Sequence, residues 1–279
     1  MKASNSKKPL SAFRGQLALI GAGKMGGAML DGWLARGLDP ANASVVDPQP
    51  GPRVRGLAKR GLKVTASPGR VKTTVAVVAV KPQDAASVMA TLKPIVRKST
   101  LVVSIMAGRK LAFLQDFVPA GTPVVRAMPN LPAAIGRGIT VAVGNRHVTA
   151  AERKLATELL AACGVVEWVA DEKLLDAVTA VSGSGPAYVF LLAEALAAAA
   201  VAAGLPAPLA AKLARETIAG AGELLRGSKL DAATLRKNVT SPGGTTAAAL
   251  DILMGPGGLE TLMETAVARA TRRSRELAG

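Results

Sequence analysis

Three closely spaced glycines near the start of the chain could bind a dinucleotide. Gly21, Gly23 and Gly26 form the pattern Gly-x-Gly-x-x-Gly, after an apolar run at 15–20 and before a helix-like segment at 27–36. In a strand-turn-helix unit, the first glycine permits a tight turn and the second lets a pyrophosphate approach the backbone. The third lets the helix pack closely on the strand. The pattern therefore predicts a nucleotide site, against the plainer alternative of an ordinary glycine-rich turn.

An acidic residue after the next strand candidate indicates which dinucleotide binds. Asp47 directly follows the apolar run 43–46. A carboxylate there would hydrogen-bond the adenosine ribose hydroxyls and would repel a 2′-phosphate by roughly 4 kcal/mol per pair of unit charges at about 4 Å. Arg53 and Arg55 could compensate by clamping that phosphate, or could be plain solvated charges. We predict NADH or NADPH as the cofactor, with a modest preference for NADH.

Three further segments leave strand candidates at the edge where open α/β sheets bind ligands. They are 79–83, which turns at Pro82, and the segments 102–108 and 126–130. From the residues alone they are candidates for lining a cleft. Lys81 fits a surface position equally well, and Met128 fits an ordinary core.

Glycine and proline interrupt strong helix formers at two places in the second half of the chain, 182–188 and 239–246. In the second segment, backbone amides and hydroxyls directly precede a helix, which suits the binding of a carboxylate. An N-cap loop with Ser/Thr capping explains the same residues equally well. The residues alone leave both readings open.

The elements that must position these segments change character about halfway along the chain. Strand candidates at 15–20, 43–46, 62–64, 75–80, 101–104, 124–127 and 139–143 alternate with helix-like segments such as 84–96. This alternation predicts an α/β fold with a doubly wound parallel sheet of the Rossmann type over 15–167. From about residue 150 only helices are expected, at 155–162, 174–181, 188–203, 207–225, 246–254 and 259–277, so 168–279 is predicted to be an all-α domain. The polar, basic residues 1–14 are predicted to form a disordered tail.

Composition excludes several functional classes. One cysteine, Cys163, and one histidine, His147, cannot form a disulfide or a Cys/His metal cluster, which predicts no metal and fits a reducing cytoplasm. Cys163 is expected to be a plain apolar residue. The net charge is +16, but only 3% of residues are aromatic and no nucleic-acid-binding motif occurs, so we expect no nucleic-acid partner. The longest uncharged candidate considered, 195–205, is shorter than a span of about 18 residues, which predicts a soluble protein without a membrane partner. The alanines at 197–200 weakly favour a homo-oligomer.

From Gly15 onward the chain resembles the pyrroline-5-carboxylate reductase family. The run 239–246 (Val-Thr-Ser-Pro-Gly-Gly-Thr-Thr), followed by Ala249-Leu250, is similar to the C-terminal signature of that family. The run 176–188 resembles its second hallmark, and 79–82 and 128–130 resemble its cofactor-side motifs. Asp47 departs from the pattern, since many members have a small or basic residue there; 67–69 is shorter than in some members, and the basic tail is extra.

The resemblance implies an NAD(P)H-dependent reduction of 1-pyrroline-5-carboxylate to L-proline, the last step of proline biosynthesis. It also implies an intertwined dimer of the helical domains, often assembled into rings of dimers. The catalytic group would be the Thr246 hydroxyl, close to the ring nitrogen of the substrate. Together with Asp47, the implied cofactor-binding residues are Ile20, Gly21, Ala22, Gly23, Lys24, Met25, Ala79, Val80, Lys81, Pro82, Ile105, Met106 and Ala107, and the substrate-binding residues are Glu172, Asn238, Ser241, Gly243, Gly244, Thr245 and Thr246.

Two rival functions differ in the residues they require. A related imine or 3-hydroxyacid reductase would usually place a lysine acid in the helical domain, where Lys173 and Lys212 are available but lie outside the glycine-interrupted segments. A non-catalytic nucleotide-binding scaffold would not need an intact segment 241–246.

Overall fold

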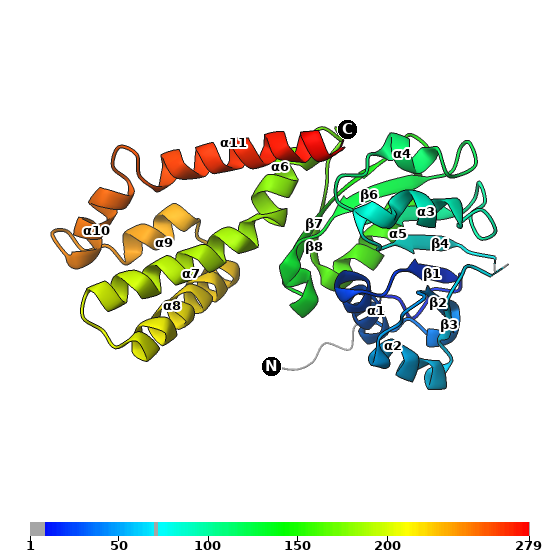
Figure 1. The fold of residues 1–279 in the computed structure, drawn as a ribbon, viewed down its shortest axis with the longest axis horizontal. Helices are drawn as coiled ribbons and strands as arrows, with labels where there is room; N and C mark the ends of the chain where they lie inside the picture. The colour runs from blue at the N-terminus through cyan, green and yellow to red at the C-terminus, as the bar shows by residue number, and fades with distance from the viewer. Residues whose placement is uncertain (1–8, 70–71, 279) are drawn as a thin grey trace. The chain divides into compact units, whose positions relative to one another are not determined.

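The computed structural model describes residues 9–69 and 72–278, which divide into two compact units (Figure 1). Unit 1 comprises Met1–Gly183 and Thr271–Gly279, and unit 2 comprises Ser184–Ala270. The units divide later in the chain than the predicted boundary at 167/168, and the last helix contributes its final turns to unit 1. Each unit is described by itself below.

Unit 1 is built on a sheet of eight strands in the order β3-β2-β1-β4-β5-β6-β7-β8. All neighbouring strands are parallel except β6 and β7, which are antiparallel. The doubly wound sheet is thus confirmed, while the prediction that it is parallel throughout is wrong at β7. The strands are β1 (Leu17–Ile20), β2 (Ala43–Val46), β3 (Lys63–Thr65), β4 (Val75–Val78), β5 (Leu101–Ser104), β6 (Val124–Met128), β7 (Gly138–Gly144) and β8 (Gly164–Trp168).

Strand β8 was not predicted because it lacks the signal of a buried strand. Its residues alternate between half-buried and exposed, whereas β1, β4 and β5 are buried at every position. Central strands of a doubly wound sheet have helices on both faces and therefore read as continuous apolar runs. An edge strand has no such run, and β8 contains the charged Glu167.

Helices cover the two faces of the sheet. One core cluster joins the sheet to α1 (Lys24–Ala35) and α5 (Ala150–Leu160), and the other joins it to α3 (Ala85–Ala90) and α4 (Leu111–Gln115). In the first cluster the buried Trp33 donates its indole N–H to the Leu159 carbonyl at 2.8 Å. The short helix α2 (Pro52–Leu57) follows β2. Helix α3 is shorter than the predicted 84–96, since Pro94 disfavours helical conformation in the residue before it.

The segment before β1 corrects the prediction of a disordered tail up to residue 14. Leu10 is 1% exposed and belongs to the core cluster of α1. Its N–H donates to the Arg36 carbonyl at 3.0 Å. Leu10 therefore anchors this segment to unit 1, and residues 1–8 lie outside the described part of the chain.

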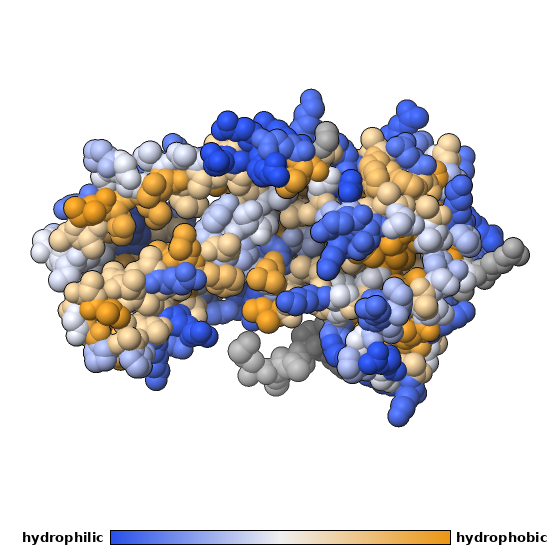
Figure 2. Space-filling view, viewed as in Figure 1, coloured by the Kyte–Doolittle hydropathy of each residue, from blue (hydrophilic) through white to orange (hydrophobic). Residues whose placement is uncertain are grey.

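Unit 2 is all-α, as predicted. Its helices are α7 (Gly185–Ala202), α8 (Ala207–Gly227), α9 (Ala232–Asn238), α10 (Thr245–Leu253) and α11 (Leu259–Ala278), of which the last turns belong to unit 1. Among its described residues, only Ala210 and Ala214 are buried. Figure 2 shows apolar side chains gathered on its surface. These helices therefore expose the side chains that would form a core.

One helical stretch, Leu174–Ala202, is long and apolar enough to cross a membrane by length and composition, and none of its apolar window is buried. This corrects the expectation that no stretch reaches that length. The stretch comprises α6 (Leu174–Val178), a π-helical turn at Thr179–Gly183, and α7. A helix that is apolar all round is equally suited to packing against protein.

Candidate active site

The carboxyl ends of four neighbouring strands bring the predicted cofactor loops together in unit 1. The chain order of the strands reverses between β1 and β4, which is where open α/β sheets bind ligands. The first residue of each loop continues the ladder by donating its N–H to the last carbonyl of the adjacent strand. These bonds join Gly21 to Val46 at 2.9 Å, Ala79 to Ile20 at 2.8 Å and Ile105 to Val78 at 3.0 Å.

The glycine turn has the geometry that a pyrophosphate requires. Gly21 has φ +87°, and a Cβ on Gly26 would lie 2.2 Å from the Gly21 carbonyl oxygen, so a side chain at Gly26 would collide with the turn. A Cβ on Gly23 would meet nothing within 4 Å. Gly23 is also the N-cap of α1 and has no side chain to cap it. The open space and the helix N-terminus fit a bound pyrophosphate.

Asp47 holds the glycine turn in place. Its Oδ2 accepts from the Ala22 N–H at 2.8 Å, and its Oδ1 accepts from the Gln49 N–H at 2.8 Å. A carboxylate has about four acceptor positions, so both oxygens keep capacity for a ribose hydroxyl. The spacing of Asp47 in the sequence predicted a ribose ligand but gave no sign of this bond to the turn.

The two arginines that could offset Asp47 have partners within the protein. Arg53 forms an ion pair with Asp31, and Arg55 donates from Nη1 to the Pro50 carbonyl at 2.6 Å. Each contact uses only Nη1, so both exposed guanidinium groups keep further N–H donors.

The side chains of the predicted cofactor residues differ in their exposure to solvent. Lys24, Lys81 and Ala107 are exposed, whereas Ile105 and Met106 are buried in the two core clusters. Ile20 is buried; Ala22, Met25, Ala79, Val80 and Pro82 are partly buried. At 105–107, therefore, the backbone and the Ala107 side chain are the groups available to a ligand.

Arg109 links two of these loops, and sequence reasoning missed it. Its Nε and Nη2 donate to the Pro82 carbonyl at 3.1 and 2.7 Å. Its guanidinium also lies 5.0 Å from the Phe113 ring centroid. The loop after β5 is thereby tied to the loop after β4. Only its position after Gly108, at the end of a strand, could have suggested this role.

Glu172 lies in unit 1, where it pairs with a buried charge. Its Oε1 accepts from Arg126 Nη1 at 2.8 Å and from the Leu111 N–H at 2.8 Å. The Arg126 side chain is 5% exposed, and a buried guanidinium is costly without such a partner. Glu172 thus fixes the segment that leads into α6. Its part in substrate binding stays a prediction.

Two of the sequence motifs meet beside α6. A Cβ on Gly183, at the end of the π-helical turn, would lie 2.7 Å from Cε of Met128. The π-helical turn therefore lies in contact with the end of the Met128 side chain, at the end of β6. π-Helical turns occur often at functional sites.

The predicted carboxylate-binding segment in unit 2 forms a tight turn before α10. The Gly244 N–H donates to the Ser241 carbonyl at 3.0 Å, Pro242 takes the second position and Gly243 has φ +66°, which is the pattern of a type II turn. The N-cap of α10 is Gly244, and no described side chain caps it, contrary to the Ser/Thr-capping alternative. The first amides of α10 are thus available to an anion.

The remaining predicted substrate residues of unit 2 lie on α10 and α9. Thr245 and Thr246 are the first two residues of α10, the first exposed and the second half-buried. Asn238 is the exposed last residue of α9. We call residues 241–246 the anion turn.

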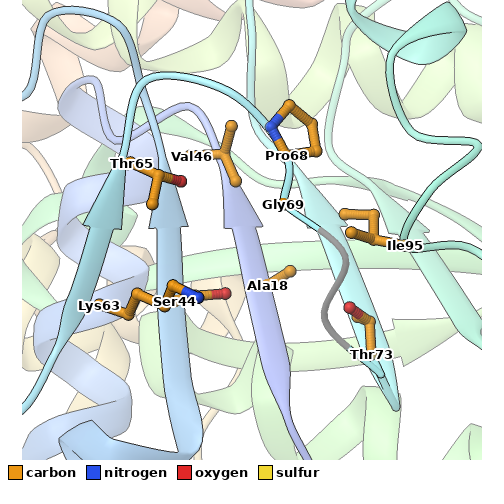
Figure 3. A pocket seen from close by; sticks show the side chains of 9 residues that line it. All are labelled: Ala18, Ser44, Val46, Lys63, Thr65, Pro68, Gly69, Thr73 and Ile95. Carbon is orange, nitrogen blue, oxygen red and sulfur yellow. The ribbon is translucent and has the colours of Figure 1, made fainter.

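A small cavity lies on the face of the sheet (Figure 3). It has a volume of about 10 Å³, room for roughly one water molecule. A dinucleotide cannot enter such a space, so we assign it no role. Its lining residues are Ala18, Ser44, Val46, Lys63, Thr65, Pro68, Gly69, Thr73 and Ile95.

Comparison with known proteins finds a matching family model in each half of the chain. Residues 172–277 match the family model described as pyrroline-5-carboxylate reductase dimerisation, and residues 16–108 match that described as NADP oxidoreductase coenzyme F420-dependent. A pyrroline-5-carboxylate reductase of Pseudomonas aeruginosa is 39% identical, and the match covers 94% of this chain and 97% of that protein. The chain belongs to the pyrroline-5-carboxylate reductase family. A Pisum sativum pyrroline-5-carboxylate reductase is 40% identical over 94% of this chain and 95% of its own length.

Solved reductases of this family share the fold. The Coxiella burnetii pyrroline-5-carboxylate reductase matches with a TM-score of 0.88 and 33% identity, over 96% of this chain and 100% of that one. The Plasmodium falciparum pyrroline carboxylate reductase, solved with NADP bound, matches with a TM-score of 0.78 and 30% identity, over 95% and 99% of the two chains.

Proposed function

We propose that this chain catalyses the NAD(P)H-dependent reduction of 1-pyrroline-5-carboxylate to L-proline. The proposal is carried by one observation. This chain, a member of the family, has both an open glycine turn that suits a dinucleotide and an uncapped anion turn that suits a carboxylate. The relatives named pyrroline-5-carboxylate reductase span nearly the whole chain.

The chemistry needs little from titratable side chains. When bound, the dihydronicotinamide supplies a hydride to the C5 carbon of the imine, and the ring nitrogen gains a proton from water. An iminium forms readily in water, so the protein has to position rather than to ionise the substrate. This fits a site whose candidate residues include neither the single histidine nor the single cysteine.

We assign the substrate contacts to the anion turn. Its amides would hold the carboxylate, in keeping with the uncapped start of α10, and the Thr246 hydroxyl would hydrogen-bond the ring nitrogen. Asn238 and Glu172 would lie nearby. The helix N-terminus also favours negative charge electrostatically.

A pair of variants at Thr246 tests this assignment. Thr246→Ala removes the hydroxyl and is expected to lower kcat by about 10- to 100-fold, while Thr246→Ser restores most of it. Dissociation constants for the dinucleotide, measured by fluorescence titration, should change less than about twofold. Equal kcat values for wild type and Thr246→Ala would remove Thr246 from the catalytic role.

We propose a modest preference for NADH over NADPH. Asp47 places a fixed negative charge beside the glycine turn, where its Oδ2 accepts from the Ala22 N–H. Asp47→Asn removes the charge and keeps an oxygen acceptor, so the ratio of kcat/KM for NADPH to that for NADH should rise about tenfold or more. Asp47→Ala also removes the acceptor for Ala22 and should weaken both cofactors. An unchanged ratio in Asp47→Asn would contradict the role of this charge.

We further propose that the working form is a homodimer that can assemble into rings, located in the cytoplasm. The dimer is supported by the match of residues 172–277 to a dimerisation family. The rings rest on the family resemblance, and the location rests on the single, buried cysteine. That no nucleic acid or membrane takes part stays a prediction.

A further inference from the structure

The last turns of α11 are held to the rest of unit 1 by a partly buried side-chain hydrogen bond. Ser274 is 8% exposed, and its Oγ donates to Oδ1 of Asp176 at 2.7 Å. Asp176 lies on α6, and the two residues are 98 positions apart in the chain. Both belong to unit 1, and Figure 1 shows the end of α11 beside α6.

The partner of this bond sits on a firmly held segment. Leu175, next to Asp176, is fully buried in the core cluster of α3 and α4. Glu172, at the entry to α6, is bonded to Arg126 and to the Leu111 N–H. Asp176 therefore offers α11 a rigid attachment point.

Beyond Ser274, the same helix reaches the loop after β5. A Cβ on Gly108 would lie 3.7 Å from the Leu277 carbonyl oxygen, which places the last turn of α11 in contact distance of this loop. Gly108 has φ +69° and lies between Ala107 and Arg109. Arg109 in turn bonds the Pro82 carbonyl. The end of α11, the loop after β5 and the loop after β4 thus form one connected series.

We propose that Asp176 and Ser274 are positioning residues, which hold the end of α11 against residues 105–108 and so fix the loop that receives the nicotinamide. The proposal rests on the proposed function. In a dinucleotide bound at the switch point, the adenosine lies toward β2 and Asp47, so the nicotinamide lies toward β4 and β5. Hydride transfer depends steeply on the distance and angle between the reacting carbons, so loosening this loop slows the transfer more than it weakens binding.

Single-turnover kinetics of the full-length protein test the proposal. The enzyme is mixed with one equivalent of reduced dinucleotide and excess 1-pyrroline-5-carboxylate, and loss of dihydronicotinamide absorbance gives a rate constant and an amplitude. Ser274→Ala and Asp176→Ala are expected to lower the rate constant by about three- to tenfold, with the amplitude and the dinucleotide dissociation constant nearly unchanged. Asp176→Asn should keep most of the rate because its amide oxygen can accept the same bond.

Thr265→Ala is the matched control, since it removes a hydroxyl from the same helix that bonds only one turn back, to the Thr261 carbonyl. It should react at the wild-type rate. A wild-type rate constant in Ser274→Ala would overturn the proposal, and so would a loss confined to the amplitude, which reports the folded fraction alone. Absence of turnover in the wild-type protein would instead refute the proposed function.

Discussion

The two units differ in where their apolar side chains lie. In unit 1 the central strands are buried along their whole length, and helices cover both faces of the sheet. In unit 2, α7 has no buried residue among those described, and Phe190 and Leu191 on this helix are 55% and 63% exposed. Unit 1 therefore contains its own hydrophobic core, whereas the apolar side chains of unit 2 are left exposed.

The exposed apolar helices of unit 2 need a covering surface, which unit 1 does not need. A helix that is apolar on all sides is stable in water only when it is covered, and obligate dimers bury such surfaces as a domain buries its core. Residues 172–277 match a dimerisation family, which indicates that a second copy of the chain covers the apolar surface of unit 2. We therefore expect the residues of unit 1 to suffice for binding a dinucleotide, and the stability of unit 2 to depend on protein concentration.

The largest expected effect comes from placing a charge on α7. Leu191→Asp would bury an unpaired carboxylate in the dimer, so the protein should lose its dimeric mass and its activity. Light scattering coupled to size-exclusion chromatography measures the mass. Val165→Asp, at a position on the edge strand β8 that is 59% exposed, is the control and should remain dimeric. A stable, active dimer of Leu191→Asp would break the comparison between the units.

Truncating the core of unit 1 should be costly in a different way. Trp33→Ala removes a fully buried side chain and its bond to the Leu159 carbonyl, which should lower the free energy of unfolding by about 3–5 kcal/mol. Because this core lies within one chain, the loss in urea unfolding should be the same across a range of protein concentrations. If the loss of unfolding free energy varied with protein concentration, the contribution of Trp33 to stability would depend on dimerisation.

A methyl group on the glycine turn should affect binding more than folding. Gly26→Ala places Cβ against the Gly21 carbonyl oxygen, and relief of this clash should shift the turn and weaken dinucleotide binding by about 10- to 100-fold. Gly56→Ala is the control, since a Cβ there meets nothing within 4 Å. Calorimetric titration of both variants gives the dissociation constants. Equal constants would show that the turn tolerates a side chain.

The smallest effect concerns the thiol of unit 1. Burial raises the pKa of Cys163 to about 11 from the ordinary 9.0, so the thiol stays protonated and unreactive in the folded protein near pH 8. Because the folded pKa lies above the unfolded one, the associated stability is fully present below about pH 9 and is lost as pH rises toward 11. A thiol reagent should label the native protein slowly and the urea-unfolded protein quickly. Rapid labelling of the native state would contradict the burial.

Local patterns in the sequence were sufficient for much of the fold. The Gly-x-Gly-x-x-Gly turn, the continuous apolar strands and the long alanine-rich helices each carry their signal within a short window. The anion turn was also visible, because proline and glycine interrupt helix formers there. Strand β8 and the antiparallel direction of β7 were not predicted, since edge position and strand direction depend on how distant segments pair.

The parts of the candidate site that could not be predicted from the sequence are hydrogen bonds between distant segments. The sequence showed Asp47 but not its bond to Ala22, and it gave no indication that Arg109 bonds the Pro82 carbonyl. Ser274 reads as one polar residue on a charged helix, and only the fold brings it to Asp176. Buried Leu10 was missed because it lies in a segment, 1–14, that is mostly polar and basic.

The reaction itself is the most direct test of the central claim that unit 1 supplies the dinucleotide site and the anion turn the substrate site. Purified protein is mixed with 1-pyrroline-5-carboxylate and either NADH or NADPH at matched concentrations, and absorbance loss and proline are measured together. We expect one proline formed for each reduced dinucleotide consumed, with NADH the faster of the two. Binding of the dinucleotide without its consumption in either mixture would contradict the account.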